Sequence, residues 1–587
     1  MEKVTLQRMS CNNRSIIRRK LPAKPLLTAG RLHPVLARVF QARDLSAENE
    51  LEYSLHHLAS MQTLKGIDQA VAVLRDALDN ETSILIIGDF DVDGATSTAL
   101  AVRALRLMGA VEVDYLVPNR FTCGYGLTPE IVAIASEYKP GLIITVDNGI
   151  SSMAGVEAAA ARGIPVLITD HHLPGDRLPA VAAIVNPNQP GDAFPSKNLA
   201  GVGVIFYLML ALRVRLREEG WFAERGIAEP NLAQLLDLVA LGTVADVVPL
   251  DYNNRILVAQ GLARIRSGRC CAGIQALIEV AGRRQADLVA ADLGFALGPR
   301  LNAAGRLDDM ALGIECLLAD SIAEARELAG RLDGLNRERR AIESEMKADA
   351  LAIVEELHMD ESADLPIGLC LFSEEWHQGV IGILASRIKD RLHRPVIAFA
   401  PGEGDEIKGS ARSVPGLHIR DALDAVAARH PGLLRKFGGH AMAAGLTLHR
   451  EQLEPFRRAF DEEVRCHLEE EQLYGRIYSD GELQPEHLNI ELAELIRRSG
   501  PWGQGFPEPL FDGIFEIVQR RIVGERHLKL VLKPPQSDSL LDAIAFNTTD
   551  SGWPEDTGRV EVAYRLDVNE YRNRRNLQLM LEHIRPL

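Results

Sequence analysis

The chain has 587 residues, enough for three or four domains of ordinary size. Hydrophobic residues make up 47% of it and charged residues 25%, which is the composition of a globular protein rather than a disordered one. A net charge of −16 argues against a protein that coats nucleic acid non-specifically, but it does not exclude an enzyme with a local basic channel.

Membrane and secretory segments are not predicted. No apolar run reaches the roughly 20 residues that a membrane helix needs, and no apolar signal core follows the basic residues near the N-terminus. The seven cysteines contain no C-x-x-C pair, so free thiols are expected. These features predict a cytoplasmic protein.

The N-terminal third of the chain divides into three parts. Residues 1–50 contain Pro22, Pro25 and Pro34, which predicts an irregular segment that wraps the surface. Residues 51–80 have helical composition. From residue 84 to about 190, β-branched runs alternate with helical stretches such as Thr96–Met108 and Pro129–Glu137, a pattern typical of a doubly wound parallel sheet.

The middle of the chain predicts a second α/β domain behind a long helix. Residues 199–265 are mostly helical, and we expect the first α/β domain to cover 51–319. The Glu/Arg/Ala-rich stretch 320–360 predicts an exposed helix that connects two domains, although an ordinary surface helix has the same composition. Residues 361–461 then contain strand-like pieces at Ile367–Phe372 and Pro395–Ala400.

The last part of the chain, 462–587, opens with an acidic helical stretch at 462–475 and then becomes β-rich. Five short strands predict a small OB-like barrel, with a small sandwich as the alternative: Phe515–Val518, His527–Leu532, Leu541–Phe546, Val560–Leu566 and Leu577–Glu582. Basic residues gather there beside Tyr571, namely Arg520, Arg521, Arg526, Lys529, Lys533, Arg572, Arg574 and Arg575. They fit a groove that follows a phosphate backbone, or else a solvated hairpin face.

Acidic residues follow four apolar runs in the first 250 residues. The runs end at Asp89-x-Asp91-x-Asp93, at Asp147-Asn148, at Asp170-His171-His172 and at Asp246. If the runs are parallel strands, their carboxyl ends meet at one edge of the sheet and the acidic residues converge there. Asp and His with little Cys are ligands for Mn²⁺ or Mg²⁺ rather than for structural zinc.

Each acidic motif also has a simpler interpretation. Alternation along a strand exit would aim Asp89, Asp91 and Asp93 to one side, but an aspartate-rich turn without metal has the same sequence. A single Asp after a strand is often a helix cap. Of two adjacent histidines, one can bind a metal while the other faces a phosphate, with Asp170 orienting a ring; a polar strand-end turn is the alternative.

A glycine pair near residue 440 predicts a phosphate contact. Gly438 and Gly439 let the backbone approach an anion closely, and His440 can donate to a phosphate oxygen. A helix predicted at Ala441–Gly445 would add its N-terminal dipole, and a tight glycine turn before that helix is the structural alternative. Arg306 and Arg412 are arginines that can clamp a phosphate.

Taken together and in order, these motifs resemble the DHH phosphoesterase superfamily, and within it the exonucleases specific for single-stranded DNA. The resemblance spans roughly residues 50–587 and rests on Asp89–Gly94, Asp147–Asn148, Asp170–His172, Thr243–Asp246, Gly298–Leu307, Trp376–Gly382, Ser410–Arg412 and Gly438–Gly445. It implies a DHH-type parallel-sheet catalytic domain, a helical connector, a DHH-associated α/β domain and a C-terminal OB-like barrel.

The resemblance also implies roles for individual residues. One or two Mn²⁺ or Mg²⁺ ions would be held by Asp91, Asp93, Asp147, His171 and Asp246. Asp89, His171 and His172 would take part in catalysis. Substrate would be bound by Arg120, Tyr125, Asn302, Arg306, Ser410, Arg412, Gly438, Gly439 and His440.

The implied activity is metal-dependent hydrolysis of single-stranded DNA to mononucleotides in the 5′-to-3′ direction, in DNA repair and recombination. The alternatives are a phosphodiesterase or pyrophosphatase for small substrates or oligonucleotides, and a non-catalytic scaffold. The C-terminal β domain favours the first, since a small-substrate enzyme has no need of it. Expected partners are single-stranded DNA with a free 5′ end, a single-stranded-DNA-binding protein and a helicase, and we expect a monomer.

Overall fold

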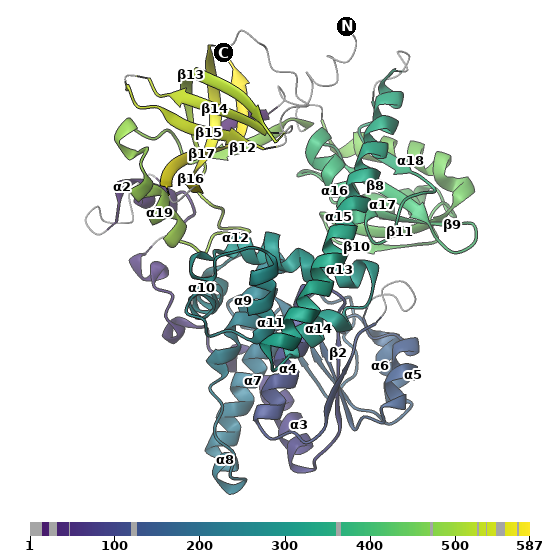
Figure 1. The fold of residues 1–587 in the computed structure, drawn as a ribbon. Coiled ribbons are helices and arrows are strands. Elements are labelled where there is room, and N and C mark those ends of the chain that lie inside the picture. Colours follow the sequence, from purple (N-terminus) through teal and green to yellow (C-terminus); the bar gives the residue numbers. More distant parts are fainter. Residues whose placement is uncertain are drawn as a thin grey trace. The chain divides into compact units, whose positions relative to one another are not determined.

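The structure is a computed structural model that describes residues 14–22, 32–45, 47–118, 126–359, 365–469, 473–524, 527–535, 537–546, 558–571 and 574–587. The chain divides into two compact units (Figure 1). The parallel-sheet unit comprises Leu45–Arg337 with Arg497–Glu508, and the barrel unit comprises Met1–Asp44, Glu338–Ile496 and Pro509–Leu587. Among the described helices, none has the length and apolar character to span a membrane.

A five-stranded parallel sheet forms the centre of the parallel-sheet unit. Its spatial order is β3 (Val113–Leu116), β2 (Ile84–Gly88), β4 (Leu142–Val146), β5 (Val166–Thr169) and β6 (Ala183–Val185). Every residue of β2, β4 and β5 is buried, which explains why these strands read as continuous apolar runs rather than alternating ones. The predicted parallel α/β fold is confirmed.

Helices connect and cover these strands. Between them lie α3 (Ile67–Asp79), α4 (Val92–Leu107), α5 (Pro129–Glu137) and α6 (Met153–Ala160). After β6 come α7 (Gly201–Glu218), α8 (Trp221–Glu224), α9 (Leu236–Ala245), α10 (Tyr252–Arg266), α11 (Ala272–Val280), α12 (Ala290–Asp292), α13 (Gly298–Leu307) and α14 (Ala311–Leu318). Helix α4 packs against β2, α7 and α9, so nearly its whole surface is buried.

The predicted connecting helix is present as α15 (Ile322–Met359), which begins in the parallel-sheet unit and ends in the barrel unit. A mixed sheet follows, in the order β10 (Lys436–Gly439), β11 (Ala443–His449), β9 (Glu406–Arg412), β8 (Val396–Pro401) and β7 (Leu369–Phe372). Its helices are α16 (Ile381–Leu392), α17 (Ile419–Arg429) and α18 (Leu453–His467). The second α/β domain is therefore built on one parallel and three antiparallel pairings.

A closed barrel follows α19 (Ile490–Arg498). Its strands are joined in the order β13 (Phe511–Val523), β14 (His527–Lys533), β15 (Leu541–Ala545), β17 (Arg574–Pro586) and β16 (Arg559–Tyr571). Strands β15 and β17 are parallel and close the barrel. The OB-like barrel is confirmed over the sandwich alternative.

The prediction of an irregular segment over residues 1–50 is wrong in two places. Strand β1 (Arg14–Arg18) pairs in parallel with β12 (Gly475–Ser479), and α2 (Pro34–Gln41) is a helix that Pro34 begins. The partner of β1 lies more than 450 residues further along the chain, so the pairing cannot be predicted from a local sequence pattern.

Two helix predictions are also wrong. In 51–80, short 3₁₀ turns at Leu55–His57 and Met61–Thr63 precede the helix, which begins only at Ile67. Residues 443–449 form strand β11 instead of a helix, because this segment pairs with β10 on one side and β9 on the other. Its inward side chains alternate with outward ones, and tertiary pairing overrides its local composition.

An ion pair between Arg43 and Asp480 anchors the N-terminal segment within the barrel unit. Both side chains are 1% exposed, and two hydrogen bonds join them, at 2.8 Å from Arg43 Nη1 and 3.1 Å from Arg43 Nη2. Asp480 also accepts from the Leu510 backbone N–H, which ties the same carboxylate to the start of the barrel.

Replacing Asp480 by Ala removes the carboxylate that compensates the charge of the buried Arg43 guanidinium, and we expect a loss of about 3–5 kcal/mol in the free energy of unfolding. Thermal melting followed by circular dichroism measures it. The matched control is Asp538→Ala, which removes a fully exposed carboxylate 3.0 Å from Lys533 Nζ and should change the midpoint little. Equal small shifts in both variants would contradict an anchoring role for the buried pair.

Candidate metal centre

The first three carboxylates come from a strand, a turn and a helix. Asp89 follows β2 and is buried, and Asp91 caps α4 by accepting from the Gly94 N–H at 3.1 Å. Asp93 lies in the first turn of α4 and is also buried. The prediction that strand alternation aligns these side chains is therefore wrong, since a helix start replaces the strand exit after Asp89.

The N-terminus of α7 holds Asp93. Gly201 N–H donates to Oδ2 at 2.6 Å and Val202 N–H donates to Oδ1 at 2.9 Å. A helix N-terminus favours a negative charge, so these bonds stabilise the carboxylate. Burial and the charge of Asp91 nevertheless raise the pKa of Asp93 above its ordinary value. The two backbone N–H groups thus fix the position of the Asp93 carboxylate, while burial and the charge of Asp91 disfavour its ionised form.

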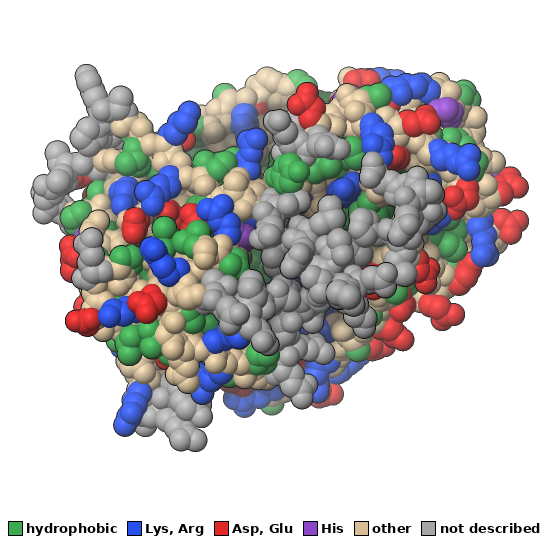
Figure 2. All heavy atoms as spheres, turned by 90° about the horizontal axis from the view of Figure 1, so that it is seen from above, with side chains coloured by type: hydrophobic (Ala, Val, Ile, Leu, Met, Phe, Trp, Pro, Cys, Tyr) green, Lys and Arg blue, Asp and Glu red, His purple; other side chains and the backbone are tan. Residues whose placement is uncertain are grey.

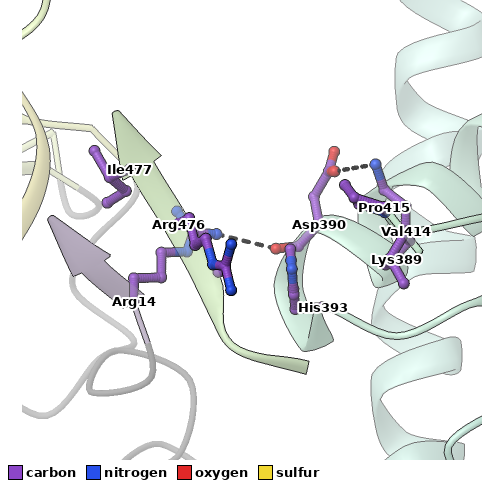
Figure 3. Close-up of a pocket in the computed structure, with 9 residues that line it drawn as sticks. Arg14, Lys389, Asp390, His393, Val414, Pro415, Arg476 and Ile477 are labelled. Carbon is purple, nitrogen blue, oxygen red and sulfur yellow. Dashed lines mark hydrogen bonds and ion pairs between the residues drawn. The ribbon is translucent and has the colours of Figure 1, made fainter. Parts of the chain in front are cut away.

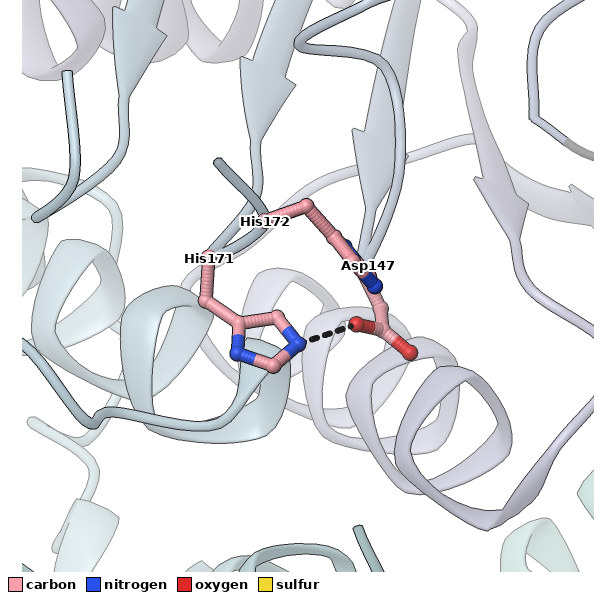
Figure 4. A group of neighbouring side chains, drawn as sticks. All are labelled: Asp147, His171 and His172. Atoms are coloured by element: carbon pink, nitrogen blue, oxygen red, sulfur yellow. Dashed lines mark ion pairs between the residues drawn. The ribbon is translucent and has the colours of Figure 1, made fainter. Parts of the chain in front are cut away.

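Three carboxylates surround one imidazole nitrogen. His171 Nε2 lies 3.1 Å from Asp147 Oδ1, 3.5 Å from Asp246 Oδ2 and 3.9 Å from Asp93 Oδ2. Figure 4 shows the His171 ring turned toward Asp147. Asp147 follows β4 and His171 follows β5, as the parallel sheet predicts. Asp246 is instead the C-cap of helix α9, so its predicted place after a strand is wrong.

The donor set fits a hard divalent cation. Ligand atoms within 4.8 Å of one another occur in three groups: Asp147, His171 and His172; Asp93, His171 and Asp246; and Asp89, Asp91 and Asp147. All donors are carboxylate oxygens or imidazole nitrogens. This mixture suits Mn²⁺, and Mg²⁺ is suited by sites in which most ligands are carboxylates. Within the described residues, the buried Asp246 Oδ2 accepts no hydrogen bond.

Electrostatics at this centre favour the binding of a cation. Burial, followed by the charges of neighbouring carboxylates, raises the pKa of Asp147 and of Asp246 well above the ordinary value. The cause is the same in both cases, because several like charges share one buried place. A divalent cation would remove the repulsion and let the carboxylates ionise.

Asp170 organises the histidine pair. Its Oδ1 lies 2.8 Å from His172 Nδ1 and accepts from the backbone N–H of His171 at 2.7 Å. Burial would lower the pKa of His172, but the hydrogen bond to Asp170 and that charge outweigh it and raise the pKa to about 9. Of the two histidine rings, the one that Asp170 contacts and can orient is therefore that of His172. The His171 and His172 rings lie edge to face, with their centroids 4.5 Å apart and their planes at 60°.

Glycines bring the surrounding helices close, a feature that the sequence reasoning missed. A Cβ on Gly201 would lie 2.7 Å from Asp147 Cβ, and a Cβ on Gly305 would lie 2.0 Å from the Phe90 carbonyl oxygen. Helix α13, which carries Asn302 and Arg306 one turn apart, therefore packs directly on the turn between Asp89 and Asp91. For the contact of Gly201 with Asp147, the sequence signal that could have been used is the run of small residues at Ala200–Gly203.

A second group of predicted site residues lies in the barrel unit. The register places Ser410 opposite Gly445 and Gly445 opposite Gly438 on neighbouring strands. Arg412 Nη1 donates to Ser410 Oγ at 3.1 Å. Gly439 has φ +149°, and a Cβ there would lie 2.4 Å from the Ala443 carbonyl oxygen, so only glycine fits.

His440 continues this group. Its backbone N–H donates to the Ala443 carbonyl at 2.8 Å, and Ala443 pairs with Arg412. Ser410, Arg412 and the segment Gly438–His440 thus lie near one edge of this sheet, on β9, on β10 and just after β10. The predicted helix dipole is absent there, because Ala443–His449 is strand β11.

Other predicted contacts are only partly covered. Arg120 and Tyr125 lie outside the described residues, as do Arg526 and Arg572. In the barrel, Lys529 and Lys533 pair with Asp542 and Asp538, and Arg575 pairs with Glu494. Figure 2 shows one face of the molecule, on which Lys and Arg side chains are mixed with Asp and Glu. The basic groove stays a prediction.

Three family models match the chain, in the order of its domains. They are the N-terminal domain of the DHH family at residues 83–243, the DHHA1 domain at 366–465 and the RecJ OB domain at 479–583.

Curated and solved proteins are similar over nearly the whole chain. The single-stranded-DNA-specific exonuclease RecJ of Dickeya dadantii is 59% identical over 95% of this chain and 96% of its own length. The crystal structure of RecJ from Thermus thermophilus in complex with Mn²⁺ matches with a TM-score of 0.79 and 30% identity, over 97% of this chain and 79% of that one. The complex of the same protein with Mg²⁺ matches with a TM-score of 0.75 and 28% identity, over 97% and 78%.

Replacing Gly201 by Ala tests the close contact behind the centre. The added Cβ forces apart α7 and Asp147, so we expect Mn²⁺ affinity to fall by roughly 10–100-fold, as for other supports of metal ligands. Calorimetric titration measures it. Gly175→Ala is the control, since a Cβ there meets no atom within 4 Å. Unchanged affinity in Gly201→Ala would show that the contact does not position Asp147.

Proposed function

We propose that this chain, which belongs to the RecJ family of single-stranded-DNA-specific exonucleases, hydrolyses single-stranded DNA to mononucleotides from its 5′ end at a divalent metal centre. The observation that carries the proposal is the convergence of Asp93, Asp147 and Asp246 on His171 Nε2 within 3.9 Å. Those residues come from α4, β4, α9 and β5, and phosphodiester hydrolysis at a bound cation accounts for their burial together.

The ligands that we propose are Asp91, Asp93, Asp147, His171 and Asp246, for one or two Mn²⁺ or Mg²⁺ ions. When bound, such an ion supplies a water of lowered pKa and neutralises charge on the phosphate. The protein's part is to fix geometry: α7 fixes Asp93, and the Asp170 carboxylate fixes the backbone at His171. The buried Asp89 stands beside Asp91 and Asp147, where it can accept a proton from the attacking water.

His172 would bind the scissile phosphate. Despite burial, the hydrogen bond to Asp170 and its charge raise the pKa of His172 to about 9, which favours a ring that donates through both nitrogens. Nδ1 lies 2.8 Å from Asp170 Oδ1, and Nε2 is the nitrogen that would donate to a phosphate oxygen. Arg306 and Asn302 on α13 border the same turn and would hold the neighbouring part of the strand.

The 5′ end would be held in the barrel unit. Arg412 and Ser410 already form one hydrogen-bonded pair, and a guanidinium with a hydroxyl is a set of donors for a terminal phosphate. Gly438 leaves the backbone of β10 open to close approach, since a Cβ there would meet no atom within 4 Å, and His440 adds a donor. Recognition of an end explains release of single nucleotides rather than internal cuts.

The closed barrel would hold the rest of the strand. Ile522 and Phe546 are more than half exposed, and the His527 and Phe546 ring centroids are 4.9 Å apart. Aromatic faces on an OB barrel can stack with bases without regard to sequence. The small-substrate alternative has no use for this element. A single-stranded-DNA-binding protein and a helicase are the partners that we propose for a monomeric enzyme.

Hydrolysis of end-labelled strands tests the function. With Mn²⁺, the protein should release the 5′-labelled nucleotide first from linear single strands, leave circular strands and duplexes intact, and stop when the metal is chelated. Asp147→Asn should lower the rate by more than about 100-fold, since even outer partners of metal ligands typically matter by 10–100-fold.

The control for that variant is Asp176→Asn, an exposed carboxylate of the same unit. Cutting of circular strands, or unchanged turnover in Asp147→Asn, would contradict the proposal.

A further inference from the structure

A cationic pocket lies in the barrel unit, apart from the residues assigned above. Its volume is about 370 Å³, and it is lined by Arg14, Lys389, Asp390, His393, Val414, Pro415, Gly475, Arg476 and Ile477 (Figure 3). Strands β1 and β12 supply one wall, the end of α16 supplies another, and the segment after β9 completes it. Four separate segments of the chain therefore build the pocket.

The pocket has an excess of positive charge. Lys389 Nζ lies 2.6 Å from Asp390 Oδ1, so the one carboxylate among the lining residues is already paired. Arg14 Nη2 donates to the Asp390 carbonyl at 3.0 Å, which holds that guanidinium at the rim. The exposed Arg476 side chain makes no hydrogen bond or ion pair within the described residues. The lining residues include three cationic side chains and one carboxylate, so the pocket is positively charged although the whole chain has a net charge of −16.

The charge of Arg14 acts on two histidines, His393 in the lining of the pocket and His583 in β17. Burial and then the charges of Arg14 and Lys389 lower the pKa of His393. Burial, Arg14 and Arg585 lower the pKa of His583 to about 4. Both rings are therefore expected to be neutral near pH 7, and the positive potential of the pocket comes from its arginines and lysine.

An apolar wall strengthens the attraction for an anion. Val414 is buried and Ile477 half-buried, and apolar surface reduces the screening of nearby charges by water. Val414 follows Arg412 by two residues, so this wall begins within about 7 Å of the strand end that carries Arg412. A pocket of this size and charge accommodates a phosphate with part of its nucleotide.

We propose that this pocket binds a backbone phosphate of single-stranded DNA and thereby adds a contact that needs no free end. The proposal rests on the function proposed above, since it takes single-stranded DNA as the substrate. Such a contact fixes the position of the strand without reading its sequence. It differs from the site at Ser410 and Arg412 in one measurable respect, because it acts equally on linear and circular strands.

The test compares Arg476→Ala, Lys389→Ala and Arg412→Ala in the full chain, with a labelled long strand and a chelator present to prevent hydrolysis. Fluorescence anisotropy is measured over a series of salt concentrations. Loss of one phosphate contact should lower the slope of log affinity against log salt by about 0.7. We expect this for Arg476→Ala and Lys389→Ala on linear and circular strands alike, whereas Arg412→Ala should weaken only 5′-phosphorylated linear strands.

The matched control is Arg458→Ala, an exposed arginine on α18 of the same unit that does not line the pocket. If Arg476→Ala and Lys389→Ala both bind circular strands with the affinity and salt slope of this control, the pocket is not a strand contact and the proposal falls. That result would stand apart from a failure of the proposed function, which would appear as absence of hydrolysis by the wild-type protein. Melting curves of each variant exclude misfolding as the cause.

Discussion

The structure depends on one electrostatic constraint, the burial of several carboxylates around a single imidazole nitrogen. Asp93, Asp147 and Asp246 reach His171 Nε2 from three different elements, and burial with mutual repulsion raises the pKa of each carboxylate. A protein has no reason to gather such groups unless a cation compensates for them. The parallel sheet, the N-terminus of α7 and the close-packed glycines all serve to hold this arrangement.

Local sequence predicted the part of the site that parallel strands supply. The runs before Asp147 and His171 are strands buried on both faces, so apolar composition alone identified them. Asp246 was placed correctly among the acidic residues but on the wrong element, since a buried helix such as α9 is as apolar as a buried strand. The roles of Gly201 and Gly305 could not be read from the sequence, because each depends on a contact with a distant segment.

The barrel unit illustrates the same limit. Its barrel strands alternate in burial and were predicted, whereas β1 was not, because its only partner is β12. Strand β11 was mistaken for a helix, since its small residues fit both conformations and pairing on both edges decides between them. The same distant pairing of β1 brings Arg14 beside α16 and so creates the cationic pocket. Features that arise from long-range pairing are thus those that sequence reasoning missed.

The central claim is that the carboxylate cluster exists to hold a divalent cation. Calorimetric titration of Mn²⁺ into the wild-type protein and into Asp246→Asn tests it most directly, because Asp246 Oδ2 is buried beside His171. We expect the wild-type protein to bind Mn²⁺ and the variant to bind it much more weakly. Without metal, the variant should be folded and should melt at a temperature no lower than that of the wild-type protein. Binding of Mn²⁺ by the variant with wild-type affinity, or no binding by either protein, would contradict the claim.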